Sequence, residues 1–122
     1  MTYKCNSRYS SFRYAVLGIK RLAGEVNFRI HFAIALLTVI AGITVSLSLI
    51  EWCIIIICIG LILGAEGLNT AIEILADRVC PYHDEKIKLV KDVAAGAVLL
   101  CAAASVLVVV LIFAGGSALI FH

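Results

Sequence analysis

Charged residues are scarce in this chain. Only 15% of its 122 residues are Asp, Glu, Lys or Arg, whereas soluble domains carry about 25%. Hydrophobic residues make up 63%, and the mean hydropathy is +1.11. A soluble globule of this size has too much surface for its volume to hide so many apolar side chains. The composition therefore excludes intrinsic disorder and predicts an integral membrane protein, with a single domain over residues 1–122.

Several familiar signatures are also missing. The five cysteines are scattered without a CxxC pair, which argues against a clustered metal site and favours reduced thiols. No GxxxxGK[ST] loop and no HRD or DFG motif occurs, so a P-loop fold and a protein-kinase fold are excluded. The net charge is only +2, and we expect no nucleic acid among the partners. Any site for a nucleotide in this chain must therefore be built differently from those of P-loop proteins and protein kinases.

Three long runs with little or no charge divide the chain. Each is long enough to cross a hydrocarbon core of about 30 Å at about 1.5 Å per helical residue. The predicted elements are three transmembrane helices at 30–50, 52–76 and 93–121, with a tight turn at 50–52 and a loop at 77–92. A cleaved signal peptide is a poor alternative, because the first run is too long and starts too far along the chain.

The basic residues are distributed unevenly. Of the ten Lys and Arg residues, six precede the first run and four lie between the second and third. Because positive charge favours the cytoplasmic side, we expect the N-terminus and the 77–92 loop in the cytoplasm and the C-terminus outside it. Residues 8–27 show apolar positions at helical spacing among basic ones. They predict an amphipathic helix on the inner membrane surface, with a merely topogenic basic leader as the alternative.

Acidic and polar residues recur on one face of the second span, where lipid would be expected. They fall at i, i+3, i+4, i+7 and i+11, and they are Glu66, Asn69, Thr70, Glu73 and Asp77. We expect Glu73 at the cytoplasmic interface and Glu66 about two turns deeper. An acid inside a span costs up to about 3 kcal/mol. This polar stripe therefore indicates a functional site, with a polar clamp between helices as the plainer alternative.

Further charged residues are expected at the same interface. Glu25, just before the first span, could meet Glu73, and paired carboxylates suit a hard cation such as Mg²⁺. Lys91, at the start of the third span, suits a phosphate group. The ensemble favours phosphoryl transfer at a membrane surface. Small residues such as Gly60 and Gly64 indicate close helix packing, and a bundle this thin favours a homo-oligomer.

The polar stripe also carries a resemblance. Its sequence EGLNTAIEILAD, residues 66–77, resembles the E-x-[LIV]-N-[ST]-[AS]-[LIV]-E-x-x-[VI]-D signature of the prokaryotic diacylglycerol kinase family. The one departure is Ala76, at a packing position. Segments at 11–15, 25–29, 81–83 and 91–98 are similar to the family as well. The resemblance therefore covers nearly the whole chain.

The resemblance implies a fold and a reaction. The family forms homotrimers of three-span subunits with a surface helix, and its active sites are shared between subunits at the cytoplasmic interface of the bacterial inner membrane. This implies an ATP- and Mg²⁺-dependent lipid kinase whose partners are ATP, a membrane lipid alcohol and further copies of the chain. The lipid is undecaprenol or diacylglycerol. The start of the first span at 31–32, the 81–83 loop and Leu89 favour undecaprenol.

The resemblance also implies roles for individual residues. Glu66 matches the general base that takes the proton of the lipid hydroxyl, and Asn69 matches a residue that positions the reactants. Glu25 and Glu73 match the carboxylates that bind Mg²⁺ on ATP. The expected nucleotide-binding residues are Arg13, Tyr82, His83, Lys91 and Asp92.

Two other functions compete with the lipid kinase. A small proton-coupled transporter would use Glu66 as a proton carrier embedded in the membrane. It would leave Glu25, Glu73, Lys91 and Asp92 without a role, and every candidate acid is expected in the cytoplasmic half. A purely structural membrane subunit would explain none of the acids.

Overall fold

The protein is built from four helices joined by short connections. The computed structural model describes residues 8–119. The helices are α1 (Arg8–Leu22), α2 (Val26–Val45), α3 (Leu49–Val79) and α4 (Glu85–Leu119). No strand occurs among residues 8–119, which confirms the predicted all-α fold.

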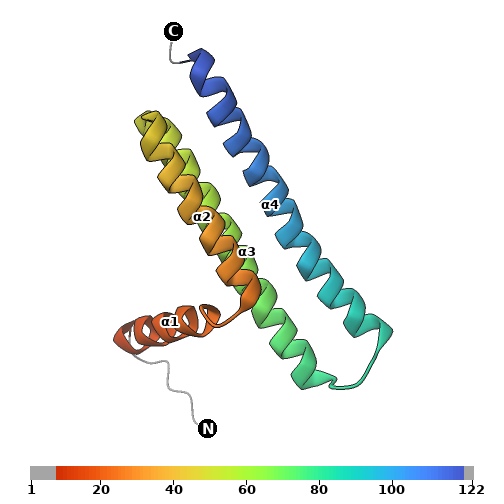
Figure 1. Cartoon of the computed structure of the whole chain (residues 1–122). Coiled ribbons are helices and arrows are strands. Elements are labelled where there is room, and N and C mark those ends of the chain that lie inside the picture. The colour runs from red at the N-terminus through yellow and green to blue at the C-terminus, as the bar shows by residue number, and fades with distance from the viewer. Residues whose placement is uncertain (1–7, 120–122) are drawn as a thin grey trace.

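The three long helices run side by side, and α1 extends sideways away from them at the start of α2 (Figure 1). Stretches of 18 residues in α2, α3 and α4 have mean hydropathies of 2.0, 2.3 and 3.0, so these helices are long and apolar enough to cross a membrane. This confirms the three-helix membrane fold expected from the sequence. The position of α1 on the inner membrane surface and the orientation of the chain stay predictions.

α3 is the central helix, because it contacts each of the other three and packs most extensively against α4. Small side chains allow this packing. The buried side chains in the described part of α4 are Ala94, Val98 and Ser105. Among the described residues, Ile55 is the only large side chain that is fully enclosed. Most other large apolar side chains therefore face outward, toward lipid or further copies of the chain. The free thiols are those of Cys53, Cys58, Cys80 and Cys101, as predicted, whereas Cys5 lies outside the described residues.

The turn between α2 and α3 lies at residues 46–48 and not at 50–52 as predicted. α2 ends at Val45, and Ser46 takes a left-handed conformation with a φ of 55°. Ser48 then caps α3, since its hydroxyl accepts a hydrogen bond from the Glu51 N–H and the Glu51 carboxylate accepts one from the Ser48 N–H. The prediction took the charge of Glu51 as the mark of a turn, but Glu51 belongs to a capping box inside the helix.

The connection between α3 and α4 is shorter than the loop predicted over 77–92. Only residues 80–84 lie outside the helices. Asp84 starts α4, because its Oδ1 accepts hydrogen bonds from the backbone N–H groups of Lys86 at 2.9 Å and Ile87 at 3.1 Å. The charged residues between 85 and 92 therefore lie in the first turns of α4. Residues 120 and 121 of the predicted third span lie outside the described residues.

α1 is also shorter than the predicted 8–27 segment. It ends at Leu22, and residues 23–25 connect it to α2. Leu22 lies close to α3, because a Cβ added to Gly67 would be 3.0 Å from the Leu22 Cδ1. This contact holds the end of α1 beside the polar stripe of α3.

Candidate active site

The polar stripe of α3 passes from the interior of the bundle to its exposed end. Glu66, Asn69 and Thr70 are buried, with 3%, 6% and 7% of their surface exposed. Glu73 and Asp77, further along the same face, are exposed. The stripe therefore joins a buried carboxylate to the surface. Because a buried charge is costly unless it has partners, the neighbours of Glu66 decide what it can do.

His31 of α2 faces Glu66 of α3. The His31 Nε2 lies 3.8 Å from the Glu66 Oε2, and the two side chains are 22% and 4% exposed. This distance is too long for a hydrogen bond but short enough for an ionic contact. No role was predicted for His31. The sequence does contain a feature that could have drawn attention to His31, because it is the one titratable side chain in the otherwise uncharged run 30–50.

Asn69 joins the buried and the exposed part of the polar stripe. Its Nδ2 donates a hydrogen bond to the Glu73 Oε1 at 3.0 Å. Its Oδ1 is buried and has no hydrogen-bond partner among the described residues. A buried carbonyl oxygen without a donor is uncommon in folded proteins. The Asn69 Oδ1 is therefore available to a hydroxyl, a water or a cation that enters the site.

At the exposed end of the polar stripe, Lys91 of α4 forms an ion pair with Asp77 of α3. Lys91 precedes the uncharged run that begins at Val93. It therefore provides a cation near the polar stripe, as phosphate binding requires.

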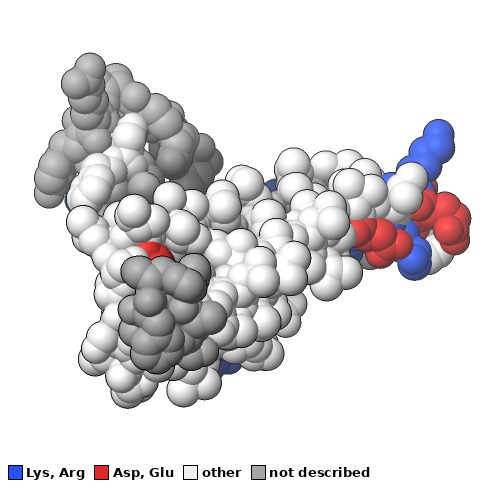
Figure 2. Space-filling model, turned by 90° about the horizontal axis from the view of Figure 1, so that it is seen from above, with Lys and Arg blue, Asp and Glu red and all other residues white. Residues whose placement is uncertain are grey.

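A cavity of about 380 Å³ lies where α3 passes into α4. It brings together three of the predicted nucleotide-binding residues, Tyr82, His83 and Lys91, and Asp77 and Lys88 also line it. Seen from above, charged side chains gather over this end of the molecule, whereas most of the visible surface is uncharged (Figure 2). This cavity, here called the interfacial cavity, has a polar edge and a size typical of small-molecule sites, which measure about 300–1,000 Å³.

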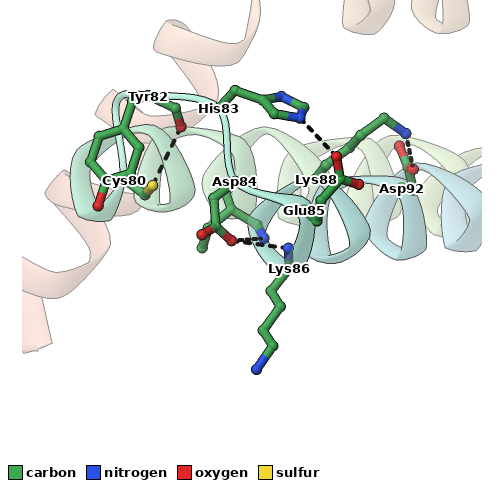
Figure 3. A network of polar contacts seen from close by, with 9 residues as sticks. Cys80, Tyr82, His83, Asp84, Glu85, Lys86, Lys88 and Asp92 are labelled. Carbon is green, nitrogen blue, oxygen red and sulfur yellow. Dashed lines mark hydrogen bonds and ion pairs between the residues drawn. The ribbon is translucent and has the colours of Figure 1, made fainter.

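Ion pairs fix the connection around this cavity (Figure 3). The His83 Nε2 lies 3.0 Å from the Glu85 Oε1, and the Lys88 Nζ lies 2.8 Å from the Asp92 Oδ2. Asp92, a predicted nucleotide-binding residue, thus pairs with Lys88 and does not itself line the cavity. Within one chain, Lys88 and Asp92 form an ion pair and His83 contacts Glu85, whereas Tyr82 is exposed and uncharged.

Two predicted site residues lie on or beside α1. Arg13 is exposed on α1, and Glu25 pairs with Arg21, whose Nη1 lies 2.6 Å from the Glu25 Oε1. In the part of the chain from 8 to 119, no group of three or more His, Cys, Asp or Glu residues could hold a metal ion. The donors at Glu25 and Glu73 are nevertheless carboxylate oxygens. They fit Mg²⁺, which takes few protein ligands and keeps waters and substrate phosphates.

A second cavity, here called the apolar cavity, has a volume of about 200 Å³ and opens between α2, α3 and α4. His31 lies in its wall, and the rest of the lining is apolar except for small hydroxyl and thiol groups, as at Thr38, Cys58 and Ser105. Apolar cavities of about 150 Å³ stay dry and take up small hydrocarbons. The apolar cavity therefore suits a segment of hydrocarbon chain next to the ionisable pair of His31 and Glu66.

Comparison with known proteins gives a consistent result. The profile described as prokaryotic diacylglycerol kinase matches residues 13–113. An undecaprenol kinase of Bacillus subtilis (strain 168) is 43% identical over 109 residues, which cover 88% of this chain and 89% of that protein. A diacylglycerol kinase of Synechocystis sp. is 40% identical over 95 residues, and one of Sinorhizobium sp. is 34% identical over 91 residues. These two matches cover 75% of this chain but only 54% and 66% of the relatives. No solved structure matches this chain.

Proposed function

This chain belongs to the prokaryotic diacylglycerol kinase family of membrane lipid kinases, and we propose that it transfers the γ-phosphate of ATP to the primary hydroxyl of a membrane lipid. The observation that carries the proposal is Glu66, a buried carboxylate on a helix that is apolar enough to span a membrane. The polar stripe connects Glu66 to the exposed end of α3. Such a carboxylate can meet a lipid that arrives from the membrane and a nucleotide that arrives from water.

Glu66 acts as the general base. Its carboxylate takes the proton of the lipid hydroxyl as that oxygen attacks the γ-phosphorus. Its burial keeps bulk water away, which favours the lipid over water as the acceptor. Asn69 positions the reactants, because its Nδ2 fixes Glu73 while its Oδ1 stays open to an incoming group.

Glu73 and Glu25 would hold Mg²⁺ on the phosphates of ATP. Asn69 occupies one oxygen of Glu73 and leaves the other for the metal. When bound, Mg²⁺ supplies positive charge that offsets the charge of the phosphate groups. Lys91 adds a second cation on the same side of the bundle, where it lies beside Asp77.

We assign ATP to the interfacial cavity. Tyr82 and Lys91 line it from the connection and from α4. Tyr82 is 72% exposed, and its ring offers a flat surface to a base. Arg13 and Asp92 complete the nucleotide site in our proposal. Because neither lies in the cavity wall of one chain, we assign them to a homotrimer in which neighbouring copies share each site. The many outward-facing apolar side chains are consistent with such an assembly.

Undecaprenol is the favoured acceptor, with diacylglycerol second. The undecaprenol kinase of Bacillus subtilis matches over nearly the whole length of both chains, unlike the two diacylglycerol kinases. The apolar cavity beside His31 also supports a plain hydrocarbon chain, since its lining carries few groups that could bind ester carbonyls.

The proton-coupled transporter has less support. It would need a polar path from Glu66 to both membrane faces. The polar stripe leads toward one end only, and in the other direction lies the apolar cavity, with Ile55, Ile59 and Val109 in its wall.

The orientation expected for the kinase is a cytoplasmic N-terminus and an extracytoplasmic C-terminus in the bacterial inner membrane. A reporter fused after His122 measures it directly. We expect an extracytoplasmic signal, because three spans separate the two termini. A cytoplasmic signal would contradict the orientation and with it the cytoplasmic ATP site.

The proposed reaction is tested with the full chain purified in detergent. Consumption of ATP is measured with and without Mg²⁺, in the presence of undecaprenol, of diacylglycerol or of no added lipid. We expect Mg²⁺-dependent turnover that requires a lipid alcohol and is faster with undecaprenol. Turnover that is independent of any lipid alcohol, or none with either lipid, would contradict a lipid kinase.

A further inference from the structure

The role of Glu66 as the base leaves one proton without a path to water. After the carboxylate takes the hydroxyl proton it is neutral, and it must lose that proton before the next turnover. The Glu66 side chain is only 4% exposed, so it cannot pass the proton directly to bulk water. A neighbouring group has to accept it. This requirement exists only if Glu66 is the base, so a role for such a neighbour rests on the proposed function.

The helices packed against α3 offer one good acceptor. From α2 comes His31, with its Nε2 3.8 Å from the Glu66 Oε2. The buried side chains of α4 are the uncharged Ala94, Val98 and Ser105, and the charged Lys91 of α4 pairs with Asp77. Cys58 lies in the wall of the apolar cavity and Cys101 lies on α4, and within residues 8–119 no hydrogen bond joins either thiol to Glu66.

The charged groups beside the contact of α1 with α3 have other partners. Leu22 is the α1 side chain that lies against α3 at Gly67, next to Glu66, and the nearby Arg21 and Glu25 pair with each other. On α3, the next acid along the polar stripe is Glu73, which accepts the hydrogen bond of Asn69. Within residues 8–119, His31 is therefore the base that contacts Glu66.

We infer that His31 accepts the catalytic proton from Glu66. The lipid O–H bond breaks, its proton moves to the Glu66 carboxylate, and the lipid oxygen bonds to the γ-phosphorus as the bond to ADP breaks. The Glu66 proton then moves to the Nε2 of neutral His31, which leaves a carboxylate beside an imidazolium. The imidazolium releases the proton to water, and both side chains return to their starting state. His31 acts through Glu66 and is a positioning residue that does not touch the reacting phosphate.

The position and chemistry of His31 suit this task. Its side chain is 22% exposed and that of Glu66 is 4% exposed, so the imidazole contacts the buried carboxylate and has more access to the surface of the chain than the carboxylate has. Imidazole is the side chain that most readily takes up and releases protons near neutral pH. The separation of 3.8 Å exceeds a hydrogen bond, but catalytic contacts are often long without substrate and shorten in the complex.

The first test is His31→Gln, which keeps a side chain able to hydrogen-bond to Glu66 but not to take up a proton. With undecaprenol and saturating ATP, we expect kcat to fall about 10²-fold, the low end of what positioned proton transfer contributes, and the KM for ATP to stay unchanged. The pH profile of kcat is recorded for both proteins, and the two profiles should differ, because the variant lacks the group that receives the proton from Glu66.

The second test is His31→Ala with imidazole added to the assay. We expect imidazole to restore turnover at least tenfold in His31→Ala and to leave His31→Gln unchanged. The matched control is Thr44→Val, a conservative change on the same helix outside both cavities, which should keep the wild-type kcat and pH profile. Thermal unfolding in detergent verifies that each variant is folded.

Two results would overturn the inference. One is a wild-type kcat and pH profile in His31→Gln. The other is a folded His31→Ala variant that imidazole fails to restore, as a merely structural contact between α2 and α3 predicts. If the wild type phosphorylates no lipid alcohol at all, the proposed function fails and the inference fails with it, which is distinguishable from a defect confined to the His31 variants.

Discussion

The two parts of the polar stripe differ in how completely their side chains are partnered. Around the interfacial cavity, charged side chains form contacts with one another, namely Lys91 with Asp77, Lys88 with Asp92 and His83 with Glu85. In the buried part, and within residues 8–119, the contact of Glu66 is the one at 3.8 Å with His31, and the Asn69 Oδ1 has no partner. The exposed side chains are therefore held by their neighbours, whereas the buried part keeps a hydrogen-bond acceptor without a donor.

The energetics of the two parts also differ. Exposed ion pairs contribute about 0–1 kcal/mol each to the free energy of unfolding. The pairs around the interfacial cavity therefore orient its side chains but add little to the stability of the fold. A buried acid costs up to about 3 kcal/mol in a membrane, and one imperfect contact with His31 does not offset that. Incompletely satisfied buried groups are characteristic of functional sites. The contrast therefore points to Glu66 for chemistry and to Lys91 for binding.

The largest effect is expected from Glu66→Gln. This change keeps the size of the side chain but removes the base, so kcat should fall about 10²–10⁴-fold while the KM for ATP changes little. Steady-state turnover with undecaprenol and varied ATP measures both. A folded Glu66→Gln variant with full kcat would return Glu66 to the role of a clamp between α2 and α3.

A smaller loss is expected from Glu73→Gln, where the open oxygen is proposed for Mg²⁺. The amide can still accept the hydrogen bond of Asn69, but it is a weaker ligand for a hard cation. The Mg²⁺ concentration at half-maximal activity should rise about 10–100-fold, and ATP binding should weaken with it. A Mg²⁺ titration of activity measures the shift. Unchanged Mg²⁺ dependence would remove Glu73 from the metal site.

A modest effect on stability is expected from Asp84→Ala. Asp84 accepts the first hydrogen bonds of α4 and fixes the connection next to the interfacial cavity. Loss of such a cap costs about 1 kcal/mol, which denaturant unfolding in detergent can measure. Asp84→Asn, which can also cap a helix, is the control and should retain most of the stability. Equal losses in both variants would show that the charge rather than the cap matters.

The smallest effect is expected from Glu85→Gln. Its side chain is 85% exposed and its contact is with the exposed His83. The free energy of unfolding should change by at most about 0.5 kcal/mol, and kcat should stay at the wild-type value. A loss of turnover comparable to that of Glu66→Gln would contradict the contrast between the two parts of the stripe.

Hydropathy and periodicity were enough to predict the membrane fold and the polar stripe. Three apolar runs required three long helices, and the spacing of Glu66, Asn69 and Glu73 fixed their common face before any packing was known. These are local properties of single helices. The residue roles and the metal site stay predictions, because they depend on substrates and further copies of the chain.

The contact of His31 with Glu66 could not be predicted, because it depends on how α2 pairs with α3. That pairing is set by the position of the turn, which the capping box of Ser48 and Glu51 moves to residues 46–48. Moving the turn from residue 47 to residue 51 would shift the α3 residue opposite His31 by about eight positions, or about 12 Å. A small error in the predicted position of a turn is thus enough to prevent the prediction of a contact between two helices.

The most direct test separates binding from chemistry in two variants, Glu66→Gln and Lys91→Gln. The Kd for MgATP is measured first, and then the rate at which prebound ATP transfers labelled γ-phosphate to undecaprenol in a single turnover. Glu66→Gln should keep the wild-type Kd and slow the transfer about 10²–10⁴-fold, whereas Lys91→Gln should bind MgATP more weakly. If Glu66→Gln weakened binding but transferred phosphate at the wild-type rate, the assignment of the buried carboxylate to chemistry would be contradicted.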